Sequence, residues 1–337
     1  MYVYFSVELL AVSESIPERK SLSNAKSSSQ ELLGVALGFA AFLIWGLFPL
    51  YFYLLREVSP LVTLSFRAVF TTALLIPIVF FRGKGPAIIQ TLRRPRLMLG
   101  LFATMATTAA SWGFFIWLVA INHTLYASLG NYACPLVSVA LGAIIFKERH
   151  GALTWFSIAL AVVAVVIFAL GVGRLPWESV IIAFVFAIYS ALRKAMNVDS
   201  TTALSVETIF ALPIGIGYIL WSAWNGGGAR PEWSTSPYYL SLLVGAGILT
   251  AIPLLLFGSA VTRVKLSTLG LLDYLCPTGQ FLCGVCVFHE STTIYQWLSF
   301  SLVWIALTFF TIDLFRAERR ERARRLSSNP VASMKTN

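Results

Sequence analysis

The chain has 337 residues, of which 58% are hydrophobic and only 12% are charged. A soluble domain carries roughly 25% charged residues, so most of the surface of this protein must face hydrocarbon. The net charge of +10 does not indicate a nucleic-acid partner, because the basic residues lie in short loops and in the C-terminal tail, between apolar runs. The composition therefore predicts an integral membrane protein.

The chain begins with a polar segment, residues 1–31, for which we expect a disordered extension rather than a signal peptide. A helix that crosses the bilayer needs about 20 apolar residues. An all-α membrane protein with ten transmembrane helices is predicted, together with a short interfacial helix at 86–94. The ten apolar runs are 33–55, 61–81, 97–120, 124–146, 153–170, 178–194, 202–224, 238–262, 266–288 and 294–315.

Lys and Arg residues are distributed unevenly between the two sides that these runs define. If the N-terminus lies inside, the outer loops hold only Arg56, Arg174 and Arg230. Basic residues prefer the cytoplasmic side, so we expect both termini in the cytoplasm. Residues 317–337 then form a basic cytoplasmic tail, which either binds anionic lipid or is a solvated tail that maintains the topology.

A duplicated stretch connects the two halves of the chain. Asn131-Tyr132-Ala133-Cys134-Pro135 returns as Asp273-Tyr274-Leu275-Cys276-Pro277, and Glu148 returns as Glu290 at the same offset. Self-similarity at a fixed offset indicates a duplicated unit.

The duplication predicts a first repeat at 32–172 and a second at 173–316. An odd number of spans, five, separates each element from its copy, so the two halves are expected to insert in opposite orientations. Two inverted five-helix repeats are typical of transporters that work by alternating access.

Prolines lie near the middle of the fourth and ninth spans. Pro135 and Pro277 each remove one helix hydrogen bond, which leaves the carbonyl groups of Asn131 and Asp273 free. One interpretation is a pair of broken helices that line a polar cavity. The alternative is a packing kink with a locally bonded Asn or Asp.

Three ionisable residues fall within predicted spans, and each would cost roughly 2.5–3.5 kcal/mol if it faced lipid. Our hypothesis pairs Glu207 with Asp273 on the inner side of the cavity, where one would hold a proton, as a proton-coupled carrier requires. Alternatively, each bonds separately to Tyr189, Tyr274 or a freed carbonyl. Arg67 is expected either to bind an anionic substrate group or to serve as a structural cation.

Aromatic residues and cysteines complete the set of candidates. Trp112 and Tyr132, like Tyr274 beside Asp273, are candidates for contact with a substrate, although aromatic residues in spans also serve as packing. The spacing of Cys283, Cys286 and His289 resembles that of metal ligands, but one helix presents them without a fourth ligand. We therefore expect no metal, no cofactor and no enzymatic activity.

The sequence resembles the RarD group of the EamA transporters, which belong to the drug/metabolite transporter superfamily. The resemblance covers about residues 33–315 and implies ten helices, two inverted repeats and a bacterial inner membrane. The similar segments are Phe115-Ile116-Trp117, Ala127-Ser128-Leu129-Gly130, Pro135-Leu136-Val137, Glu207-Thr208 and Leu266-Ser267-Thr268-Leu269-Gly270. This chain departs from the group pattern at Phe66, Tyr126, Cys134 and Asp273, where the group has His, Glu, Asn and Gln.

Together these features predict a secondary transporter that moves a small organic metabolite or drug by alternating access, with protons as the candidate coupling ion and a homodimer as a candidate assembly. Two alternatives stay open. One is an amino-acid-like exporter, and the other is a non-transporting membrane sensor or assembly protein that keeps the fold.

Overall fold

The computed structural model describes residues 16–327, apart from residues 82, 148–149, 197, 199, 226–231 and 265. The described part of the chain is built from helices and contains no strand. In chain order the helices are α2 (Ile16–Gly46), α3 (Phe48–Leu54), α4 (Pro60–Phe81), α5 (Gly85–Leu92), α6 (Pro95–Ala120), α7 (Thr124–Ile145), α8 (Ala152–Val172), α9 (Trp177–Met196), α10 (Ser200–Asn225), α11 (Glu232–Thr235), α12 (Pro237–Val261), α13 (Leu266–Asp273), α14 (Leu275–Leu282), the π-helix η1 (Cys283–Val287) and α15 (Ile294–Ser327).

Ten helical segments of the described chain are long and apolar enough to cross a membrane, which confirms the predicted number. Each begins and ends within a few residues of the predicted run. The short helix expected at 86–94 is also confirmed, as α5.

Within the predicted N-terminal extension, residues 16–31 form the first turns of α2, which begins at Ile16. Adding turns to an existing helix costs far less than starting a new one, so the apolar part of α2 supports the polar turns before it. Residues 1–15 and 328–337, at the ends of the predicted extension and tail, lie outside the described residues.

Prolines interrupt the spans in a different pattern from the predicted one. Helix α7 continues through Pro135 without a break, whereas the ninth span is divided at Tyr274, shortly before Pro277. The expected pair of broken helices is therefore present only in the second half. A proline bends an α-helix without ending it when the flanking turns keep their own hydrogen bonds.

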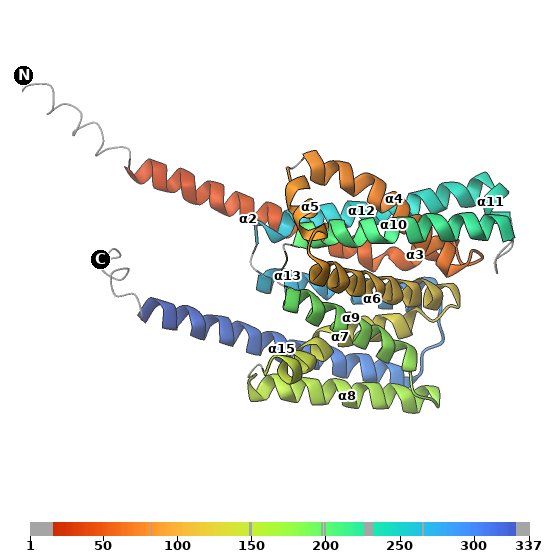
Figure 1. Ribbon diagram of the computed structural model, residues 1–337. Helices are drawn as coiled ribbons and strands as arrows, with labels where there is room; N and C mark the ends of the chain where they lie inside the picture. The colour runs from red at the N-terminus through yellow and green to blue at the C-terminus, as the bar shows by residue number, and fades with distance from the viewer. Residues whose placement is uncertain are drawn as a thin grey trace, which may run out of the picture.

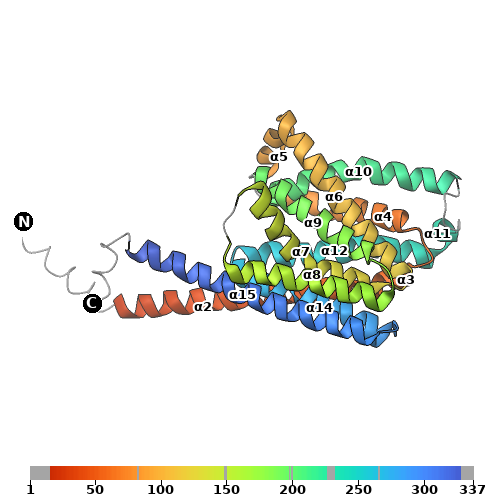
Figure 2. The same cartoon turned by 90° about the horizontal axis from the view of Figure 1, so that it is seen from below.

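The two ends of the bundle are distinguishable. Helices α2 and α15 emerge from the same end, at which α5 also lies (Figure 1). We call this the terminal end, and the opposite end, with the loops 121–123, 173–176 and 288–293, the distal end. Viewed from below, α2 and α15 again leave the bundle together (Figure 2).

Helices that correspond in the two predicted repeats pack on each other: α8 on α15, α4 on α10, and α7 on α14. In the pair formed by α8 and α15, two hydrogen bonds show the relative direction of the helices. Thr154 near the start of α8 donates a 2.6 Å hydrogen bond to Asp313 near the end of the apolar part of α15, whereas Ser299 near the start of α15 donates a 2.7 Å bond to the carbonyl of Ala164. The α8–α15 pair is therefore antiparallel.

The core is concentrated toward the distal end. All of the largest fully buried side chains except Leu101 and Leu136 belong to the distal half of their helix. They are Tyr132, Phe48, Phe52, Phe168, Phe300, Leu55, Leu101, Leu118, Leu125, Leu129, Leu136 and Ile182.

Candidate functional site

The fourth and ninth spans meet along a polar seam. Here the side chains of α7 bond to groups of α14 that lie beside or just after Pro277. The bonds run from Ser128 Oγ to the Pro277 carbonyl (2.8 Å), from Asn131 Nδ2 to Gln280 Oε1 (2.7 Å), and between the hydroxyls of Tyr132 and Thr278 (2.6 Å). Two predicted residues, Asn131 and Tyr132, thus join the two halves of the chain.

Arg67 of α4 is enclosed by α6 and α12. Its Cζ atom lies 3.6 Å from the ring centroid of Trp112, and its Nε donates a 2.8 Å hydrogen bond to Thr250 Oγ1. Only 8% of its surface is exposed, and no described carboxylate forms an ion pair with it. A buried cation without a counterion leaves positive charge that a bound anion would neutralise.

Glu207 of α10 is also buried, and its partners differ from the predicted one. Thr104 Oγ1 donates a 2.7 Å hydrogen bond to Glu207 Oε1, and Arg193 lies 3.5 Å from the same oxygen. No described hydrogen bond or ion pair joins Glu207 to Asp273, so the predicted pair is not formed in this structure. The two carboxylates lie on helices with different neighbours: α10 packs on α4, α5 and α6, whereas α13 packs on α2, α12, α14 and α15.

Asp273 is the last residue of α13, immediately before the break at Tyr274. Its side chain is exposed, although it lies close enough to buried Cys134 on α7 to act on it electrostatically. No described residue forms a hydrogen bond with its carboxylate.

The two copies of the repeated segment differ in burial. Leu129 of α7 is 0% exposed, whereas its repeat counterpart Leu271 of α13 is 41% exposed. Helix α7 is buried mainly over its first half, which is distal, and in the ninth span the buried residues Pro277, Gln280 and Phe281 are distal too. The buried residues of both copies therefore lie toward the distal end of the bundle.

A carboxylate from the second half of the chain caps α7 at the distal end. Glu290 accepts hydrogen bonds from the backbone N–H groups of Thr124 (2.5 Å, Oε1) and Leu125 (3.0 Å, Oε2). The residue before α7, His123, supplies no side-chain cap. Burial raises the pKa of Glu290 even though it accepts these bonds. Its repeat counterpart, Glu148, lies outside the described residues.

Several residues of this site escaped the sequence analysis. Thr104 and Thr250 are small hydroxyl residues, which are common in membrane helices and carry no pattern of their own. Arg193, at the end of a span, was interpreted only as one of the basic residues that set the orientation in the membrane. Gln280 could have been identified from the sequence, because an amide side chain within an apolar run requires a hydrogen-bond partner.

The ten apolar helices and the buried polar groups between them define a multi-pass membrane protein with an interior polar site, as transporters have. A family model described as "EamA-like transporter family" matches residues 32–170. The chain is 38% identical over 307 residues to the protein RarD of Streptomyces exfoliatus, covering 91% of this chain and 96% of the relative.

It is also 32% identical over 298 residues to the protein RarD of Escherichia coli K12 (88% and 99% covered) and 36% identical over 293 residues to an uncharacterized transporter of Vibrio cholerae (87% and 96%). A solved structure, titled "Crystal structure of protein", has the same fold, with a TM-score of 0.56 at 19% identity, covering 83% of this chain and 96% of that one. The chain belongs to the RarD group of the EamA transporter family, in the drug/metabolite transporter superfamily.

Proposed function

We propose that this protein is a secondary carrier that moves a small organic metabolite or drug across the bacterial inner membrane by alternating access. The observation that carries the proposal is the unequal burial of Leu129 and Leu271, identical residues at equivalent positions of the two repeats. In an inverted-repeat carrier, exchanging the environments of such a pair converts one access state into the other.

The antiparallel packing of corresponding helices supports inverted repeats. With both termini in the cytoplasm, as the distribution of basic residues predicts, the closed distal end is periplasmic. We assign the conformation described above to the inward-open state.

Arg67 and Trp112 are the proposed contacts for the substrate. A guanidinium group stacked on an indole ring can hold a carboxylate or another anion while the ring contacts a planar apolar part. We infer that the substrate carries an anionic group. An amino-acid-like substrate is the second candidate, because Asp273 offers an opposite charge for an ammonium group.

The coupling proton is assigned to Asp273 rather than to Glu207. The Glu207 carboxylate is already held by Thr104 and Arg193. Asp273 forms no hydrogen bond with a described residue, so its carboxylate is the one left to bind the proton.

Single cysteines at positions 129 and 271, in a background without the four native cysteines, test the access state. In inside-out vesicles, a membrane-impermeant maleimide should label Leu271→Cys much faster than Leu129→Cys. A ligand found by thermal stabilisation of the purified protein should change both rates in opposite directions. Equal labelling of the two positions, with and without that ligand, would contradict alternating access.

Transport itself is measured with the same ligand in proteoliposomes. Flux that is abolished by Arg67→Ala supports a carrier. Ligand binding without any flux in the unmodified protein would instead favour a sensor or assembly protein that keeps the fold.

A further inference from the structure

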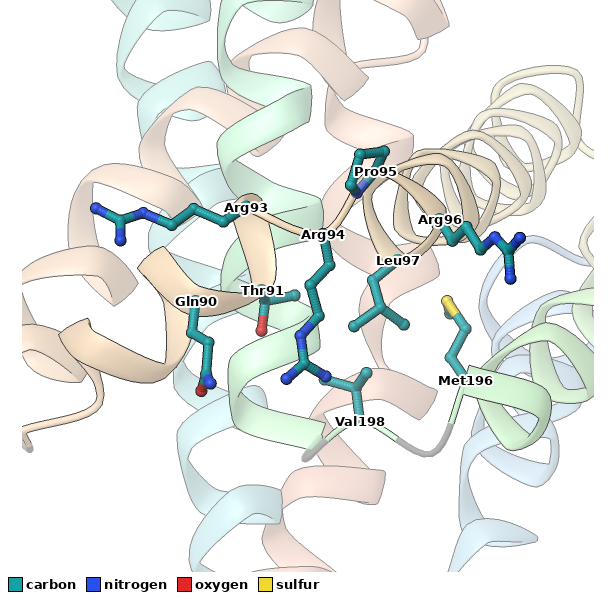
Figure 3. Close-up of a pocket in the computed structure, with 9 residues that line it drawn as sticks. All are labelled: Gln90, Thr91, Arg93, Arg94, Pro95, Arg96, Leu97, Met196 and Val198. Carbon is teal, nitrogen blue, oxygen red and sulfur yellow. The ribbon is translucent and has the colours of Figure 1, made fainter.

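A cavity lined by basic and apolar residues lies at the terminal end of the bundle, away from the seam between α7 and α14. It measures about 680 Å³ and lies between the α5–α6 connection and the end of α9. Its described lining residues are Gln90, Thr91, Arg93, Arg94, Pro95, Arg96, Leu97, Met196 and Val198 (Figure 3). None of these residues is acidic.

Arg94 is the cation that projects into this cavity. Its side chain extends between Gln90 and Val198, whereas Arg93 and Arg96 point to opposite sides (Figure 3). None of the three guanidinium groups forms a hydrogen bond or an ion pair with a described residue. Three cations within four positions, none of them paired with a described acidic residue, attract an anion.

The surface beside the arginines is apolar. On α6, Leu99 and Phe102 follow Arg96 at intervals of three residues, so all three lie along one side of the helix. Leu99 is 72% exposed and Phe102 is 46% exposed. In a span of this hydropathy these side chains face the hydrocarbon tails of lipids. The cavity therefore lies at the end of a span whose neighbouring surface is apolar and exposed.

We propose that this cavity binds the phosphate group of an anionic phospholipid, with Arg94 as its direct ligand and Arg93 and Arg96 as flanking charges. A guanidinium fork matches two oxygens of a phosphate, and basic pockets at the cytoplasmic side of membrane helices suit anionic headgroups. The acyl chains lie along Leu99 and Phe102. This site is separate from the basic C-terminal tail and does not depend on the transport proposal.

The test uses the full-length protein in detergent, with phosphatidylglycerol, phosphatidylcholine or inorganic phosphate as the probe. Lipid retention is measured by native mass spectrometry, and stabilisation by thermal unfolding. The variant is Arg94→Gln. The matched control is Arg56→Gln, which removes one exposed positive charge from the connection between α3 and α4, away from both this cavity and the basic tail.

We expect phosphatidylglycerol, but not phosphatidylcholine, to be retained and to raise the unfolding temperature. Arg94→Gln should weaken retention at least about tenfold, the loss expected when a hydrogen bond between charged groups is removed. Arg56→Gln should retain lipid as the unmodified protein does. Arg94→Lys keeps the charge but lacks the guanidinium fork, so its lipid retention should lie between that of the unmodified protein and that of Arg94→Gln. It is the test variant if Arg94→Gln does not fold.

Two outcomes would overturn the proposal. Equal retention of phosphatidylglycerol by the unmodified protein and by Arg94→Gln would exclude the site. The other outcome is that inorganic phosphate stabilises the protein, that this effect requires Arg94, and that phosphatidylglycerol is not preferred. This result would identify a soluble phosphate ligand and exclude the lipid.

Discussion

The contact between Glu290 and α7 allows a quantitative prediction about the closed distal end. Glu290 lies in the loop before α15, yet it provides the only side-chain acceptor described for the first N–H groups of α7, those of Thr124 and Leu125. Replacing it with alanine leaves two partly buried N–H groups without a partner. The change therefore weakens both α7 and the contact between the two halves of the chain.

The magnitude follows from these two hydrogen bonds. A hydrogen bond to a charged group contributes about 1.5–3 kcal/mol, and losing a helix N-cap costs about 1 kcal/mol. Burial of the carboxylate, which is reflected in its raised pKa, offsets part of this gain. We expect Glu290→Ala to lower the free energy of unfolding by about 2 kcal/mol. Glu290→Gln keeps one acceptor and should lower it by about 1 kcal/mol.

The pH dependence has a definite sign. Burial gives Glu290 a higher pKa in the closed conformation than a solvated carboxyl has, so the closed conformation binds the proton more tightly. Protonation therefore favours the closed distal end, and this contribution is lost as the pH rises through the raised pKa. Glu290→Gln cannot titrate and should lack this part of the pH dependence.

Unfolding by titration with sodium dodecyl sulfate at pH 5 and pH 7.5 measures both effects. Glu31→Gln, at an exposed position of α2, is the matched control and should behave as the unmodified protein does. The argument fails if Glu290→Ala unfolds at the same detergent fraction as the unmodified protein. It also fails if Glu290→Gln keeps the full difference between the two pH values.

Two further substitutions test the packing. Trp112→Leu removes the ring stacked on Arg67, and the loss of a desolvated cation–π contact should cost about 2 kcal/mol; an unchanged thermal midpoint would contradict this contact. Gly279→Ala would place its Cβ 2.8 Å from the Cα of Gly46, so it should destabilise the α2–α14 crossing by about 1–3 kcal/mol. Gly258→Ala, which has open space around its Cβ, should not destabilise the protein, and equal effects of the two glycine changes would refute the reasoning.

Local properties of the sequence determined the number and limits of the spans. Hydropathy and run length depend only on neighbouring residues, and the bilayer imposes one length on every span. For the same reason α5 was predictable, as was the position of Arg67 and Glu207 within spans. The duplicated segments also identified corresponding helices before any contact between them was known.

Only the tertiary structure decided which buried groups meet. Glu207 bonds to Thr104 and lies near Arg193 rather than Asp273, and Glu290 caps a helix from the other repeat. These choices depend on how each helix is rotated about its axis and where it crosses its neighbours. Packing between distant segments sets both quantities, and hydropathy along a single helix contains no record of them.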